Sequence, residues 1–322
     1  MTTLTKNGNG QHAESAMRRY SLLLLFGLGT FLLVAAVLMR FYAYPKLAVA
    51  PLEQKSDTFL SAEDATILDL ATLSPITTDL EVSVRTQGDV AASEEAGDDV
   101  RIWVSTTSIR SADGEIRSRS VDRAPFDTVT GFGVDCCDGW TSENDGERVP
   151  TTFEGVVFKF PFNTQKEDYP YWDGTLREPV TLSYDGEEEV DGLTTYRFIG
   201  EVPDTVVGTR DVPGSLVNSD EATVTADTHY ANAYTILVEP NTGAIVDLTQ
   251  EQNGYVEANG AQIPTTQATI SYTDAQVADM VDEVGTQGPL LGNLRGLFPI
   301  GAAIIGLLLL GAGFALMRSR RA

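Results

Sequence analysis

The stretch YTILVEPNTGAIVDLTQ, residues 234–250, decides the fold class of this 322-residue chain. Two runs rich in Val, Ile and Thr flank the residues PNTG, 240–243, a combination that favours a tight turn. β-branched and aromatic side chains fit the pleated surface of a strand. The stretch therefore predicts an antiparallel hairpin.

Similar short runs, bounded by turn residues, recur along the chain after Leu80. They predict strands at Leu80–Arg85, Val100–Ser108, Gly155–Phe162, Val180–Tyr184, Thr194–Glu201, Ala222–Ala226, Tyr234–Glu239, Ala244–Gln250 and Gln267–Tyr272. Helix is sparse in this region, and the best candidate is Asp274–Glu283, which follows Thr273 as a suitable N-cap. We expect one mainly β domain, built as an antiparallel curved sheet or a barrel-like structure.

Two uncharged apolar segments, residues 20–39 and 296–317, flank this domain. At about 1.5 Å per residue, a helix of either length covers the roughly 30 Å hydrocarbon core of a bilayer. A cleavable signal peptide is the alternative for the first segment, because Arg18 and Arg19 precede it and residues 48–50 (AVA) resemble a cleavage site. The length of the apolar run favours an uncleaved transmembrane helix.

Basic residues near the outer ends of the two segments predict that both termini are cytoplasmic. These residues are Lys6, Arg18, Arg19, Arg318, Arg320 and Arg321. We expect a double-pass protein of the cell membrane, with cytoplasmic tails at residues 1–19 and 318–322 and an extracytoplasmic domain at residues 40–295.

Small residues in the apolar segments allow the two helices to approach each other. Gly306 forms a small-xxx-small pair with Ala302, and Gly29 lies at a comparable place in the first segment. The alternative is that these residues face lipid.

The domain between the segments is strongly acidic. Glu14 is the only one of 46 acidic residues outside Phe41–Asn293, whereas eight of the 22 basic residues lie outside it. Binding of nucleic acid depends on Lys and Arg that neutralise phosphates. We therefore expect no nucleic-acid partner.

The two cysteines are neighbours, Cys136 and Cys137, in the sequence GVDCCDGW. Disulfides persist outside the cytoplasm, so the expected state is a vicinal disulfide. Links to other chains and free thiols are the alternatives. A metal site is not expected, because zinc normally needs four ligands and His229 is the only histidine of the domain.

Catalytic signatures are absent from the sequence. Nucleophilic hydrolysis usually needs a Ser or Cys beside a His, and no such motif surrounds His229. The acidic run Asp185–Gly192 has carboxylates that could bind calcium, but it lacks EF-hand spacing and is better interpreted as a solvated hairpin turn. We predict no catalytic residues, no cofactor and no enzymatic activity.

Aromatic side chains concentrate in Val156–Trp172. Core packing is the ordinary explanation, because large aromatic residues dominate most β cores. The functional alternative is a cavity for an apolar ligand, since such sites are mostly hydrophobic. On that hypothesis the ligand-binding residues are Phe158, Phe160, Tyr169, Trp172, Tyr196 and Phe198, and both Phe158 with Phe160 and Tyr196 with Phe198 share a strand face.

Five elements in this order resemble one known family. They are the first apolar segment followed by RFYAYPKLAVAP, then GVVFKFPFNTQKEDYPYWDGT, EEVDGLTTYRF, VEPNTGAIVD and the last apolar segment. Together they resemble the actinobacterial porin PorA family over nearly the whole chain. The resemblance implies a double-pass membrane protein of the cell envelope with a β-rich extracytoplasmic domain. Some relatives are linked to the handling of envelope lipids or lipoglycans, and the family name suggests a pore.

We therefore expect a non-enzymatic protein that binds or transfers an envelope lipid or a lipid-linked glycan. Its expected partners are that lipid or glycan and membrane proteins of envelope biosynthesis. The alternatives are a structural scaffold for those proteins and a porin-like channel. A porin barrel needs strands that alternate lipid-facing apolar residues with polar ones, and Asp and Glu interrupt the pattern of this chain too often.

Overall fold

The computed structural model describes residues 9–69 and 71–319. The predicted cytoplasmic tails fall partly outside these ranges, and Lys6, Arg320 and Arg321 lie outside them. The chain divides into a helical unit, Met1–Ala48 with Pro289–Ala322, and a sheet unit, Val49–Gly288.

Two stretches, Arg19–Leu47 and Asp274–Arg318, are helical, long and apolar enough to cross a membrane. They contain both predicted transmembrane segments, and the predicted helix Asp274–Glu283 is the first part of α4. The helices are α1 Asn9–Leu38, the π-helix η1 Met39–Ala43, α2 Tyr44–Leu47, α3 Val90–Ala96, the 3-10 helix η2 Gly214–Val217, α4 Asp274–Arg295 and α5 Leu297–Arg318.

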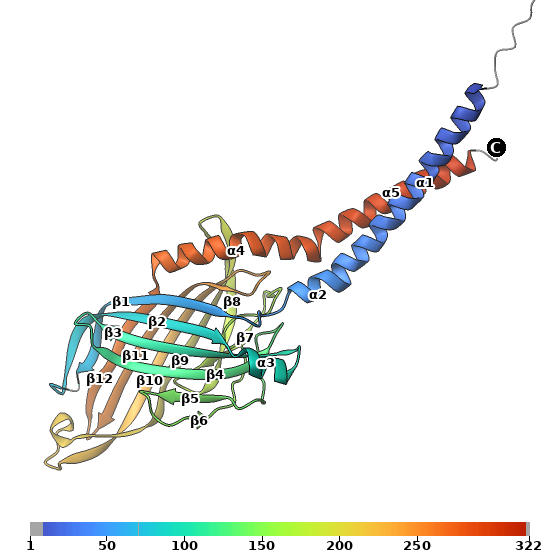
Figure 1. The fold of residues 1–322 in the computed structure, drawn as a ribbon. Coiled ribbons are helices and arrows are strands. Elements are labelled where there is room, and N and C mark those ends of the chain that lie inside the picture. The colour runs from blue at the N-terminus through green and yellow to red at the C-terminus, as the bar shows by residue number, and fades with distance from the viewer. Residues whose placement is uncertain (1–8, 70, 320–322) are drawn as a thin grey trace, which may run out of the picture. The chain divides into compact units, whose positions relative to one another are not determined.

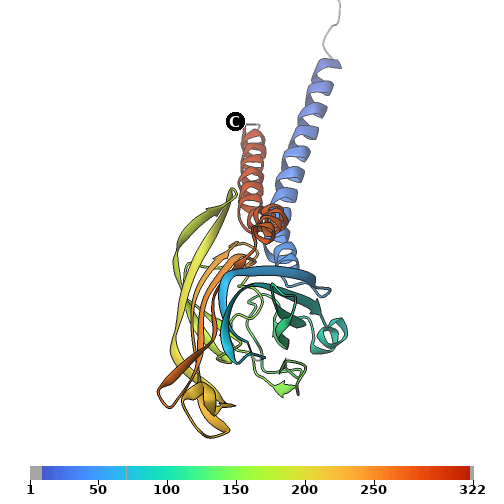
Figure 2. The ribbon, with the colours of Figure 1, turned by 90° about the vertical axis from the view of Figure 1, so that its left-hand side faces the viewer.

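Twelve strands form one antiparallel sheet, which confirms the predicted fold class. The strands are β1 Lys55–Asp69, β2 Ser74–Gly88, β3 Val100–Ser111, β4 Ile116–Asp127, β5 Trp140–Glu143, β6 Val149–Pro150, β7 Tyr169–Asp173, β8 Glu178–Val190, β9 Leu193–Pro213, β10 Thr223–Val238, β11 Ile245–Ala258 and β12 Ala261–Tyr272. Their order across the sheet is β6-β5-β4-β3-β2-β1-β12-β11-β10-β9-β8-β7, so β6 and β7 are the edges. The sheet is strongly curved but its ladder does not close (Figures 1 and 2).

The main core lies on the concave side of the sheet. It gathers buried residues from β1 and β2, from all strands between β7 and β12, and from the irregular segment before β7. Leu60 and Ala62 of β1 face Val82 and Leu80 of β2 in register, so their side chains share one face. Period-two alternation of apolar residues therefore builds this core.

The predicted strand Gly155–Phe162 is wrong. Only Val156 makes β-bridges, one to Phe132 and one to Tyr171. Farther along, the Phe160 amide donates to the Gly243 carbonyl at 2.8 Å and the Phe162 amide donates to the Val129 carbonyl at 2.9 Å. The segment is irregular because it bonds to several loops instead of following one neighbouring strand.

The other predicted strands lie within or overlap β2, β3, β8, β9, β10, β11 and β12. The predicted turn at residues 240–243 joins β10 to β11, as expected. Asp191 and Gly192 form the turn between β8 and β9, both with positive φ, which agrees with the hairpin interpretation of the acidic run.

Within the helical unit, α1 and α5 pack through glycines. A Cβ added at Gly29 would lie 2.9 Å from the Gly306 carbonyl oxygen, and one added at Gly306 would lie 2.8 Å from the Gly29 carbonyl oxygen. The two backbones thus come as close as small residues permit, as the sequence suggested.

Replacement of Gly306 by Leu should force α1 and α5 apart and destabilise the protein by about 1–3 kcal/mol, the usual cost of overpacking. The melting temperature of the full-length protein in detergent micelles measures the effect. Gly311→Leu is the matched control, because a Cβ at Gly311 meets nothing within 4 Å. Equal melting temperatures for the two variants would contradict the close approach.

Candidate functional site

Three of the six aromatic residues predicted to bind a ligand meet in the main core. Phe160 stacks on Phe198 with ring centroids 4.9 Å apart, and Tyr169 meets these rings edge-on at 5.4 and 5.6 Å. Phe160 and Phe198 have no exposed surface, and Tyr169 is 5% exposed. These three side chains fill the interior, and a ligand role for them stays a prediction.

Of the other three, Phe158 belongs to a different cluster, whereas Tyr196 lies at the margin of the main core. Phe158 packs on Trp103 and Phe126 with both centroid distances at 5.4 Å, in a separate small cluster. Trp172 packs on Phe153 at 5.1 Å. Tyr196 meets Tyr184 at 5.6 Å.

The expected sharing of one face by Phe158 and Phe160 is wrong, because the segment that carries them is not a strand. Phe158 belongs to the cluster with Trp103, whereas Phe160 belongs to the main core. The six predicted residues therefore do not form one surface.

A buried carboxylate ties β7 to β10. One oxygen of Asp173 accepts hydrogen bonds from the hydroxyls of Tyr230 at 3.0 Å and Tyr234 at 2.7 Å. The other accepts from the backbone amides of Thr175 and Leu176. Burial raises the pKa of both tyrosines, so they remain neutral donors at physiological pH. Both oxygens of the Asp173 carboxylate are thus hydrogen-bonded, and they link β7 to β10 and to the turn after β7.

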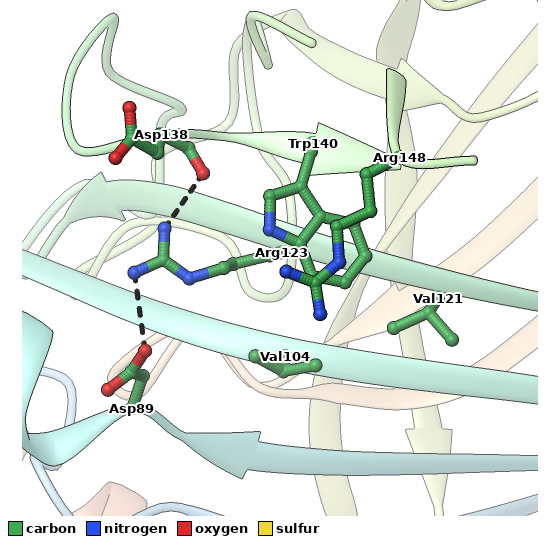
Figure 3. Close-up of a pocket in the computed structure, with 7 residues that line it drawn as sticks. All are labelled: Asp89, Val104, Val121, Arg123, Asp138, Trp140 and Arg148. Carbon is green, nitrogen blue, oxygen red and sulfur yellow. Dashed lines mark hydrogen bonds and ion pairs between the residues drawn. The ribbon is translucent and has the colours of Figure 1, made fainter. Parts of the chain in front are cut away.

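A pocket of about 600 Å³ lies where β3, β4 and β5 run side by side (Figure 3). Val104 of β3 pairs with Arg123 of β4, and Arg123 pairs with Trp140 of β5. Residues paired in this way point to the same face of a sheet. The lining consists of two valines, two arginines, two aspartates and one tryptophan, namely Val104, Val121, Arg123, Arg148, Asp89, Asp138 and Trp140. We call it the Trp140 pocket.

Arg123 is held on both sides in this pocket. Its Nη2 lies 3.2 Å from a carboxylate oxygen of Asp89, and its Nη1 donates to the backbone carbonyls of Cys137 and Asp138. Asp89 is itself fixed, because it caps α3 by accepting from the amide of Ala92. The guanidinium of Arg123 is therefore already engaged, and its side chain is only 15% exposed.

Arg148 is different. Its guanidinium carbon lies 4.2 Å from the ring centroid of Trp140 (Figure 3). Among the described residues, no hydrogen bond or ion pair engages its N–H groups. A guanidinium that stacks on an indole keeps the donors in its plane free for oxygen acceptors. With the carboxylate of Asp138 and the two valines nearby, the pocket offers donors, acceptors and apolar surface to a polar ligand.

Cys136 and Cys137 form a disulfide bond with each other next to this pocket. They line a second pocket of about 310 Å³, which shares Asp138 with the first. Cys137 and Asp138 both have positive φ, 61° and 55°, a conformation that is costly for residues other than glycine.

Sequence reasoning had identified Cys136 and Cys137 but not Arg123, Arg148 or Trp140. The available signal was the excess of acidic over basic residues in the domain, which makes each arginine notable, and the tryptophan that follows the cysteines in GVDCCDGW. Among the described residues, no group of three or more His, Cys, Asp or Glu side chains could hold a metal ion.

Comparisons with known proteins all give the same family. A family model described as Porin PorA matches residues 22–315. A protein of Corynebacterium amycolatum named Porin PorA is 26% identical over 290 residues, which cover 70% of this chain and 74% of that protein. A Porin PorA of Corynebacterium resistens is 30% identical over 80 residues, or 23% of this chain and 19% of that protein.

Replacement of Phe160 by Ala tests whether its surroundings are core or a ligand cavity. In a packed core the change should cost about 3–5 kcal/mol of unfolding free energy. Thermal unfolding of the full-length protein in micelles measures this loss. Phe59→Ala, at an exposed position of β1, is the control and should change stability little. A small loss at Phe160 together with reduced lipid content would support the ligand-lining hypothesis instead.

Proposed function

Because the chain belongs to the porin PorA family, we propose that it is a non-enzymatic protein of the cell envelope that binds an envelope lipid or a lipid-linked glycan. The head group of that molecule occupies the Trp140 pocket. The two apolar helices hold the sheet unit at the membrane where such molecules reside.

The observation that carries the proposal is the stack of Arg148 on Trp140. Envelope head groups present hydroxyl, phosphate or carboxylate oxygens, which are acceptors for a free guanidinium edge. The face of a sugar ring and the methyl groups of Val104 and Val121 are both apolar, so the pocket complements both parts of such a group. Arg123 supports the site by holding Asp89 and the loop at Asp138 in place.

The sheet lacks the outer surface of a membrane barrel. Large apolar side chains that are exposed in the sheet unit are few and scattered over several elements, namely Phe59, Leu73, Ile116, Val129, Val149, Ile199 and Val206. A transmembrane barrel needs a continuous apolar band around the strands. This distribution favours a water-exposed sheet over a channel formed by the strands.

The environment of His229 is compatible with the non-enzymatic role that we propose. Its Nδ1 lies 3.1 Å from a carboxylate oxygen of Asp204, and its ring stacks on Tyr255 with centroids 4.4 Å apart. The other oxygen of Asp204 accepts from the Tyr255 hydroxyl. Within the described contacts, no Ser or Cys nucleophile bonds to this imidazole, so the usual nucleophile and base pair is missing.

The proposed topology places the sheet unit outside the cytoplasm and both termini inside. It follows from the basic residues at the outer ends of the apolar segments. Reporter fusions should show residue 150 outside the cytoplasm and both ends of the chain inside. A cytoplasmic signal at residue 150, or secretion of a chain cut after Ala50, would contradict this topology.

Substitution of Arg148 by Ala should weaken binding of the head group about tenfold, which corresponds to about 1.4 kcal/mol of lost interaction, and occupancy should fall accordingly. Native mass spectrometry of the full-length protein released from micelles measures the co-purified lipid or glycan. Arg210→Ala is the control, because Arg210 is an exposed arginine on β9, outside the pocket.

The result separates the proposal from its alternatives. Equal occupancy in the two variants would contradict the site. A wild-type protein that carries no lipid or glycan but co-purifies with envelope-biosynthesis proteins would favour the scaffold. Ion conductance in planar bilayers would favour a channel.

A further inference from the structure

We propose that Cys136–Cys137 is a thiol–disulfide exchange site, and that its redox state sets the position of Arg123 and with it the shape of the Trp140 pocket. The partner is a dithiol, either a small molecule or a dithiol protein. The consequence for ligand binding rests on the function proposed above. The coupling between the cysteines and Arg123 is independent of that function.

The contacts of Arg123 connect the disulfide to the pocket. Its Nη1 donates to the carbonyl oxygen of Cys137 and, at 2.8 Å, to that of Asp138. Its remaining acceptor is the carboxylate of Asp89 on the opposite side. Two of the three groups that hold this guanidinium are therefore backbone atoms of the disulfide loop. Figure 3 shows the contacts with Asp138 and Asp89.

The disulfide constrains the same backbone. A bond between neighbouring cysteines closes a small ring that includes the peptide unit between them, which restricts rotation on both sides. Cys137 and the following Asp138 are held at φ values of 61° and 55°, where an L-residue is strained. Release of the ring allows both residues to leave this conformation, and their carbonyl oxygens then turn away from Arg123.

The ends of the loop stay fixed when the ring opens. The amide of Val134 donates to the Pro125 carbonyl at 3.1 Å, and the amide of Thr151 donates to the Gly139 carbonyl at 2.9 Å. The change is thereby confined to residues 135–138. It is transmitted to Arg123 without loss of the β4–β5 pairing.

The sulfur atoms are accessible to a reductant. Both cysteines are only partly buried, and they line the open pocket of about 310 Å³ together with Asp135, Asp138 and Thr152. The two carboxylates disfavour reagents that carry negative charge in addition to the attacking thiolate. Exchange therefore favours a dithiol that has no other anionic group.

The chemistry is a balanced exchange. A thiolate of the dithiol attacks one sulfur of the Cys136–Cys137 bond, that bond breaks, and a mixed disulfide forms while the other cysteine leaves as a thiolate. The second thiol of the reagent then displaces the bound cysteine. The protein gains two electrons and two protons, and the reagent becomes a disulfide.

The test uses the full-length protein in detergent micelles and dithiothreitol as the dithiol. Mass analysis reports whether two thiols form without unfolding. Phenylglyoxal modifies accessible guanidinium groups, and peptide mapping then gives the labelling of Arg123 relative to the exposed Arg210. On reduction, labelling of Arg123 should rise about tenfold, because two charge-assisted hydrogen bonds are lost, while that of Arg210 stays constant.

Two variants control the measurement. The double variant Cys136→Ser with Cys137→Ser should show the same high labelling of Arg123 as the wild-type protein after reduction. Dithiothreitol should not change that labelling. Asp89→Asn removes the carboxylate charge that pairs with Arg123 and leaves the disulfide intact. It should therefore raise Arg123 labelling before reduction, and reduction should raise that labelling further.

Several results would overturn the inference. One is unchanged Arg123 labelling in protein whose mass shows two thiols, which would mean that the disulfide only braces the turn. Another is a disulfide that dithiothreitol reduces only after unfolding. Neither the mass measurement nor the labelling of Arg123 depends on a ligand. A negative result in these measurements therefore contradicts this inference without contradicting the proposed function. A fall in co-purified lipid or glycan on reduction tests the link between the two.

Discussion

The two edge strands of the sheet, β6 and β7, do not pair with each other. The irregular segment of residues 153–164 makes backbone hydrogen bonds in the gap between the two ends of the sheet. Val156 bridges Phe132, in the loop after β4, and Tyr171 of β7, which lie on opposite sides of the open ladder. Farther along, the Phe160 amide bonds to Gly243, and Phe160 itself is completely buried. Without this segment the curved sheet would expose both its interior and unpaired backbone groups, each of which is costly.

The β10–β11 turn binds that segment through backbone hydrogen bonds. The buried carboxylate of Glu239 accepts from the amides of Asn241 and Thr242 and from both of their side chains. Gly243 has φ of 73°, and a Cβ there would lie 2.1 Å from the Phe160 carbonyl oxygen. A Cβ at Gly288 of α4 would meet the Glu239 carboxylate at 2.6 Å. One turn thus positions the core segment and the first part of α4.

Local composition decided which strands the sequence could predict. The segments predicted within β8 to β12 are rich in β-branched and aromatic residues, and turn residues bound them. In β1 the pairing with β2 shifts between Ala62 and Ala65, where Asp64 has positive φ. The buried apolar residues are at even positions before this bulge and at odd positions after it. The sequence therefore shows no continuous alternation, and no strand was predicted there. The pocket could not be predicted, because Asp89, Arg123 and Arg148 are far apart in the sequence. They come together through the pairing of β3, β4 and β5 and through the segments before α3 and β6. No local pattern encodes that arrangement.

The core and the pocket differ in what a ligand would have to displace. Phe160 and Phe198 are in mutual contact and fully buried, so entry beside them must break packing worth several kcal/mol, on the order of a core Phe→Ala substitution. Arg148 already has its guanidinium stacked and its donors unengaged within the described contacts, so a head group there meets a preorganised surface. Recognition outside the core therefore requires no loss of core packing. The aromatic interior can then remain a scaffold while the proposed binding takes place at the Trp140 pocket.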